Sequence, residues 1–236
     1  MLVAAAVCPC PPLLVPEVAT GAASELQAAR AACVDAVGVL AASRPDRLYV
    51  VGPVEEDAAR GVYPAGSEGS FAGFGVDLSV RLGTGPGGDR ALPAPLAVGA
   101  WLLGRAGWAA APVEGRGVPA TAAPEDCAAA GRELAAGTGR IALLVLGDGS
   151  ACRSVKAPGY FDERAAGFDA EAARALGAAD VPALLALDAE LAFALQVAGR
   201  APWQVLAGAA EGAGLDGRLL HDDAPYGVGY MVAAWS

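Results

Sequence analysis

Short apolar runs that end at proline or glycine recur along the chain, and each predicts a buried strand. The clearest three are Leu2–Val7, Arg47–Pro53 and Arg140–Gly147. Runs of this length without polar alternation are typical of strands that are buried on both faces of a parallel sheet. Weaker patterns predict further strands at Val76–Leu82, Trp108–Pro112, Asp216–His221 and Val228–Trp235.

Between these runs, apolar residues at three-to-four spacing predict helices. The expected helices are Pro16–Ala42, Pro95–Gly107, Pro124–Ala136, Asp162–Leu176, Val181–Val197 and Trp203–Ala213. Strands that alternate with helices imply a largely parallel central sheet covered by helices on both faces. With no internal repeat and no clean linker, residues 1–236 are predicted to form one α/β domain.

Composition and charge argue against nucleic acid and a membrane as binding partners. The net charge of −10 argues against nucleic-acid binding, which needs basic patches against phosphate. Mean hydropathy is high at +0.42, but the longest charge-free stretches are broken by proline or, like Ala91–Gly104, too short to span a bilayer. The residues Met1–Cys10 lack the positive start of a secretory leader, and the five cysteines show no CxxC pair. We therefore expect a cytoplasmic protein without a membrane partner.

Three loops follow predicted buried strands, at the edge of an open α/β sheet where ligands usually bind. They are Cys8–Glu17, Pro53–Glu56 and Gly147–Lys156. The glycine-rich stretch Glu55–Phe74 is also long for a structureless loop, which makes it a candidate functional segment. These positions predict a small-molecule pocket at the carboxyl ends of the strands.

Within these loops, each polar residue has a functional and a plain interpretation. Cys10 is a candidate nucleophile or metal ligand, although an ordinary buried thiol is favoured. Glu55 is a candidate pocket carboxylate, but with Glu56 and Asp57 it also fits a solvated loop face. Asp148 and Ser150 form a polar turn directly after a buried strand; Asp148 is either an active-site group or a cap for the following segment.

Three further residues complete the candidate set. Lys156 is the only lysine in a chain that otherwise uses arginine, and Tyr160 closes the irregular piece after the polar turn. His221 is the only histidine, so any Ser–His–Asp triad or imidazole-based metal site would have to use it. Its place at the end of a predicted strand favours a structural or surface role.

Three motifs together resemble a known family. They are Cys8-Pro-Cys-Pro-Pro-Leu-Leu-Val-Pro-Glu17, Gly147-Asp-Gly-Ser150 followed by Lys156-Ala-Pro-Gly159, and Asp222-Asp-Ala-Pro-Tyr-Gly-Val-Gly-Tyr230. The chain resembles an actinobacterial group similar to the catalytic B subunit of class III extradiol ring-cleavage dioxygenases. The resemblance implies a three-layer α/β/α fold, assembly into an oligomer and, in active members, Fe(II) held by two histidines and a glutamate. In active members, the resemblance also implies a further histidine that acts as acid and base.

The residues at the corresponding positions depart from this pattern. The resemblance puts the first iron histidine at Cys10, the second near Val54 or Glu55, and the acid/base histidine at Ala151. For the glutamate it points by order to Asp188 and Glu190. Since these positions hold no imidazole, the sequence predicts neither a His-based iron site nor a cofactor.

Three hypotheses follow. The first is a divergent family member that has lost ring cleavage but keeps a small-molecule pocket, lined by Cys10, Glu55, Asp148 and Ser150, with Lys156 and Tyr160 as further candidates. The second is an enzyme of altered chemistry, either metal-dependent or with Cys10 as nucleophile and Asp148 as base. The third is a structural or interaction protein, which includes a homo-oligomer.

Overall fold

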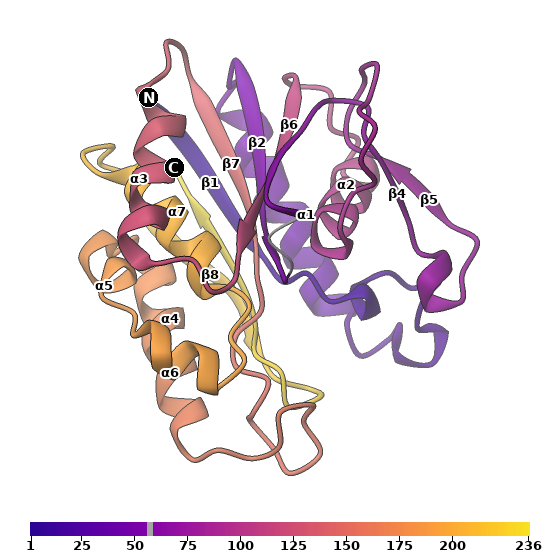
Figure 1. Ribbon diagram of the computed structural model, residues 1–236, viewed down its shortest axis with the longest axis vertical. Coiled ribbons are helices and arrows are strands. Elements are labelled where there is room, and N and C mark those ends of the chain that lie inside the picture. The colour runs from indigo at the N-terminus through magenta and orange to yellow at the C-terminus, as the bar shows by residue number, and fades with distance from the viewer. Residues whose placement is uncertain (56–58) are drawn as a thin grey trace.

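The computed structural model describes residues 1–55 and 59–236, and it shows a three-layer α/β/α fold (Figure 1). The central sheet has the order β3-β6-β2-β7-β1-β9-β8. Its strands are β1 Leu2–Cys8, β2 Arg47–Val54, β3 Gly61–Tyr63, β6 Val113–Pro119, β7 Ile141–Leu146, β8 Gly217–Asp223 and β9 Tyr230–Trp235. The four strands β6, β2, β7 and β1 are parallel, whereas β3, β9 and β8 each run antiparallel to their inner neighbour.

Helices cover both faces of this sheet. On one face lie α1 Gln27–Ala42 and α2 Ala94–Arg105. On the other lie α3 Pro124–Ala136, α4 Arg164–Gly177, α5 Val181–Leu185, α6 Ala189–Ala194 and α7 Arg200–Ala210. A small hairpin, β4 Glu68–Ser70 with β5 Ser79–Arg81, packs beside α2, and short 3-10 helices occupy Pro12–Leu14, Thr20–Ala22 and Ala72–Phe74.

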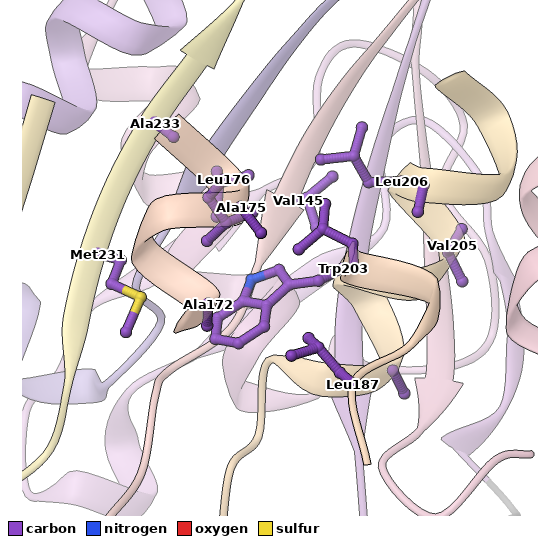
Figure 2. Packing of buried hydrophobic residues seen from close by; sticks show 14 of the residues in the cluster. Val145, Ala172, Ala175, Leu176, Leu187, Trp203, Val205, Leu206, Met231 and Ala233 are labelled. Carbon is purple, nitrogen blue, oxygen red and sulfur yellow. The ribbon is translucent and has the colours of Figure 1, made fainter. Parts of the chain in front are cut away.

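Each side of the sheet has its own apolar core. The apolar run of β7 is buried at every position because this strand lies between β2 and β1 with helices above and below. On the α7 side, the fully buried Trp203 packs among Val145, Leu187 and Met231 (Figure 2). Burial of such side chains is the main favourable term in folding.

Two glycines allow α3 and α7 to pack closely. A β-carbon at Gly131 would lie 2.0 Å from the Val205 carbonyl oxygen, and one at Gly208 would lie 2.1 Å from that of Ala128. Only residues without side chains permit such backbone contact. The pair α3–α7 therefore forms a tight layer over the parallel part of the sheet.

Most predicted elements are confirmed, and three are corrected. The strand expected at Trp108–Pro112 is instead β6, Val113–Pro119. Two buried positions of β6, Gly115 and Gly117, carry no side chain. At Gly115 a β-carbon would lie only 2.9 Å from the Leu82 side chain and 3.0 Å from that of Tyr63, so these neighbours already fill the space. The apolar pattern of this strand is thus supplied by its neighbours.

The other two corrections concern helix boundaries. The helix expected from Pro16 begins at Gln27, after short 3-10 turns. The helix expected over Val181–Val197 is two helices, α5 and α6. Asp188 starts the second, since its carboxylate accepts hydrogen bonds from the amides of Glu190 (2.9 Å) and Leu191 (3.0 Å).

The fold contains no helix, in the described ranges, whose length and apolar character would suffice to cross a membrane. Glu56 and Asp57, which the sequence analysis assigned with Glu55 to a solvated loop face, lie outside the described residues. The rest of Glu55–Phe74 contains β3, β4 and a 3-10 helix rather than one structureless loop.

Candidate functional site

Strand register brings Cys10 and Asp148 together. In the parallel pair β1–β7, Cys8 lies opposite Leu146, and the Gly147 amide continues the ladder to the Cys8 carbonyl (3.0 Å). Two residues past each strand end, the Cys10 amide donates a hydrogen bond to Asp148 Oδ1 at 2.8 Å. The contact between two loops far apart in the sequence is thus a consequence of the pairing of their strands.

Close backbone packing fixes the direction of the Asp148 turn. The Asp148 carbonyl accepts a hydrogen bond from the Gly199 amide (2.8 Å). A β-carbon at Gly147 would lie 2.3 Å from the Gly199 α-carbon, so this approach requires glycine. The start of α7 therefore holds the polar turn against the end of β7.

A cavity of about 1200 Å³ opens at these strand ends. Its walls come from the loops after β1, β2, β6 and β7, from the first residues of α2, and from the segment between α6 and α7. The polar and aromatic residues that line it are Cys10, Glu55, Phe74, Asp148, Phe193 and Gln196. Three residues predicted from sequence, Cys10, Glu55 and Asp148, therefore share one cavity.

The Asp148 carboxyl and the Cys10 thiol both have raised pKa values. Burial raises the pKa of the half-buried Asp148 carboxyl to about 7, although the hydrogen bond from the Cys10 amide acts in the opposite direction. Burial, and next the neighbouring Asp148, raise the pKa of the Cys10 thiol well above its usual value. The floor therefore holds a neutral thiol beside a carboxyl group that titrates near neutral pH.

The rim of the cavity is apolar. Phe74 and Phe193 keep 46% and 73% of their surface exposed, which is unusual for large apolar side chains. Phe74 ends the 3-10 helix Ala72–Phe74, whereas Phe193 lies on α6. The helices α2 and α6 cover opposite faces of the sheet (Figure 1). Next to Phe193, Gln196 has a positive φ of 54°, a conformation that costs energy for any residue but glycine.

The other four predicted residues do not line this cavity. Ser150 is fully buried, and Lys156 is exposed on the loop surface. Tyr160 is 76% exposed with a positive φ of 62°, and its side chain projects into solvent. His221 lies half-buried on the edge strand β8, opposite Val232, with a register shift just before it. The structure therefore does not bring these four side chains to the cavity, because proximity in sequence to the polar turn does not carry a side chain to the strand ends.

Ser150 belongs instead to a buried network centred on Asp169 of α4. The Asp169 carboxylate accepts hydrogen bonds from the Ser150 amide and from the Arg153 guanidinium, both at 2.8 Å. The Ser150 hydroxyl donates to the Leu195 carbonyl and accepts from the Cys152 amide, both at 3.0 Å. With these partners the serine is a structural residue rather than a free nucleophile.

Sequence reasoning missed Asp169, Phe74, Phe193 and Gln196. Asp169 did carry a signal, because it is a charged residue beside Phe168 and between Ala165 and Ala173 on the apolar side of a predicted helix. The two phenylalanines carried none, since exposure in a rim depends on how distant segments meet.

The donor set at the cavity does not fit the iron site that the family resemblance implies. No three His, Cys, Asp or Glu side chains within residues 1–55 and 59–236 are arranged as metal ligands. Cys10 stands where the resemblance puts an imidazole, and Ala151, whose amide bonds to the Leu195 carbonyl, does not line the cavity. Asp188, one of the two residues suggested by order for the glutamate, is occupied as the cap of α6, and Glu190 is exposed.

Comparison with known proteins shows the fold alone. No protein-family model and no curated protein matches this chain. Among solved structures, it is similar to the uncharacterized protein JW3007 from Escherichia coli K12, with a TM-score of 0.56, 13% sequence identity and 99% of each chain covered. The likeness extends over the whole chain and supports a three-layer α/β/α architecture.

Proposed function

We propose that this protein binds a small organic molecule in the cavity at the strand ends, on a fold of the extradiol dioxygenase type, without cleaving aromatic rings. The observation that carries the proposal is the side-chain set of the cavity, with Cys10, Glu55 and Asp148 at its polar positions. Oxygen activation in this family needs two neutral imidazoles and one carboxylate on iron. The chain has one histidine, and His221 is on the edge strand β8.

The same geometry weighs against an enzyme that uses Cys10 as nucleophile. Only a thiolate attacks efficiently, and reactive cysteines have lowered pKa values and open surroundings. Cys10 has 4% of its surface exposed, and both burial and the nearby Asp148 raise the pKa of its thiol. A binding role fits these properties better than covalent chemistry does.

Ring cleavage is tested with catechol and protocatechuate, with added ferrous iron and ascorbate. We expect neither oxygen uptake nor a ring-opened product, and no stoichiometric iron after purification and elemental analysis. Oxygen consumption linked to substrate loss would contradict the proposal. Alkylation of Cys10 in the native protein is measured by mass spectrometry. A rate equal to that of an unfolded control would favour Cys10 as a nucleophile over the binding role.

Ligand binding is tested by a fragment screen with ligand-observed NMR. Ala194→Trp places a bulky side chain on an exposed lining position of α6, and Ala170→Trp makes the same change on the exposed face of α4, away from the cavity. We expect fragments that bind the unmodified protein to lose binding in the first variant and keep it in the second. A library without hits, or hits that survive Ala194→Trp, would overturn the proposal.

A further inference from the structure

The charges in the cavity all have one sign. Among its described lining residues, the carboxyl groups are those of Glu55 and Asp148, and neither arginine nor lysine is present. The nearest arginine in the polar turn's loop, Arg153, is already paired with Asp169 at 2.8 Å. An anionic ligand would therefore meet repulsion without a compensating cation.

Asp148 has no cationic partner among the residues that the structure describes. Its Oδ1 accepts a hydrogen bond from the Cys10 amide. Within the part of the chain that the structure describes, no ion pair involves Asp148 or Glu55. A carboxylate that is partly removed from water is costly unless a positive charge lies near it. A cation bound in the cavity would supply that charge.

The rest of the wall favours an apolar body on such a ligand. Phe74 and Phe193 present exposed rings from two sides, and Pro11, Pro53 and Val197 add apolar surface. Aromatic faces also attract an ammonium group, most strongly where water is excluded. The volume of about 1200 Å³ is ample for a ring with a short side chain.

One feature of the wall favours anions, but it is weak. The N-terminus of α2 faces the cavity, and helix N-termini carry a partial positive charge. Pro95 has no amide hydrogen, and the Ala97 amide donates to the Pro93 carbonyl at 2.9 Å, so few donors of the first turn are free. Two carboxylates outweigh this partial charge.

We infer that the ligand of this cavity is an organic cation, an ammonium group joined to an apolar body of about the size of one ring, with Asp148 as its principal counter-charge. The inference rests on the proposed binding function and names the class of molecule that the same site selects. Phe74 and Phe193 would contact the apolar body, and Glu55 would add a second, more solvated negative charge.

The test compares three probes that have the same ring and differ in charge. Phenethylammonium, phenethyl alcohol and phenylacetate are titrated into the whole chain at about pH 8, where most of the Asp148 carboxyl is ionised, and binding is followed by protein-observed NMR or calorimetry. We expect the ammonium compound to bind about tenfold more tightly than the alcohol, and the carboxylate to bind more weakly still.

Variants assign the effect to the carboxylate. Asp148→Asn keeps an oxygen for the Cys10 amide but removes the charge, so ammonium affinity should fall about tenfold while affinity for the alcohol changes by less than about twofold. Glu133→Gln removes one charge from the exposed face of α3 and is the matched control, with no expected change in affinity.

The outcomes separate this inference from the proposed function. Equal or tighter binding of the alcohol or the carboxylate overturns the cation inference and leaves the binding function intact. Equal loss of ammonium affinity in Asp148→Asn and Glu133→Gln also overturns it, because the effect would then come from net charge. Failure of all three probes, together with a fragment screen without hits, overturns both.

Discussion

Residues of the loop after β7 belong to two regions of opposite character, one around Asp148 at the start of the loop and one around Asp169 of α4. Asp148 faces a cavity, accepts a hydrogen bond from the Cys10 amide, and has no cationic partner among the described residues. Two residues later, Ser150 enters a network in which Asp169 has both an amide donor and the Arg153 guanidinium. Burial raises the pKa of both carboxyl groups, yet of the two only Asp169 has its charge balanced by a described residue.

This difference separates a structural carboxylate from one that is available to a ligand. A buried polar group with all its partners stabilises the fold, whereas one with an unmet charge lowers stability and is typical of functional sites. The contrast predicts opposite signs for substitutions at the two aspartates.

The largest expected effect is at Asp169. Asp169→Ala leaves Arg153 and the Ser150 amide without their acceptor, and we expect a loss of about 3 kcal/mol in the free energy of unfolding. Urea titration measures this, with Asp169→Asn as the milder control because its amide oxygen can still accept from Ser150. If Asp169→Ala lowers the free energy of unfolding by less than about 0.5 kcal/mol, Asp169 is not the stabilising carboxylate that the comparison with Asp148 requires.

The next effect is a gain in stability at Asp148 that depends on pH. Its folded pKa of about 7 lies above the unfolded value of about 3.9, so its favourable contribution is complete below about pH 4 and is lost as pH rises through about 7. Asp148→Asn should therefore stabilise the protein by about 2 kcal/mol at about pH 8, and by less at about pH 5.

Urea unfolding of the unmodified protein and the variant at the two pH values checks this prediction. Glu133→Gln, on the exposed face of α3, serves as control and should show no such difference. A variant that is less stable than the unmodified protein at the higher pH would mean that Asp148 has a stabilising partner after all.

A smaller effect is expected at Ser150, within the same turn. Ser150→Ala removes a hydroxyl that bonds the Leu195 carbonyl and the Cys152 amide, and it should cost about 1.5 kcal/mol. Thermal unfolding measures the loss. Affinity for phenethylammonium should stay within about twofold, since the side chain does not line the cavity; a larger change would join the two regions functionally.

The smallest effects are expected at two residues that the sequence suggested for the pocket and that do not line the cavity. Lys156→Ala and His221→Ala should each change stability by less than about 0.5 kcal/mol and leave probe affinity unchanged. Lys156 is exposed, and His221 is on an edge strand. Reduced probe binding in either variant would show that the cavity extends farther than its present lining.

The sequence predicted the parallel part of the sheet well, because strands buried on both faces show continuous apolar runs. β1, β2 and β7 appear within a residue or two of their expected bounds, and α3 appears as expected. The prediction placed β6 too early in the chain, because the buried positions Gly115 and Gly117 of this strand have no apolar side chains that would reveal it. Local patterns thus predict an element only where its own side chains provide the burial.

For the candidate site, the sequence by itself determined the chemistry that is present: one histidine, a cysteine at position 10, and polar residues directly after three buried strands. Only the tertiary structure decided which of these groups meet. The register of β1 against β7 places the Cys10 amide on Asp148, while the fold of the following loop turns Ser150 inward to Asp169 and leaves Tyr160 in solvent. The physical reason is that side-chain type is a local property, whereas burial and charge balance depend on segments far apart in the chain that pack against one another.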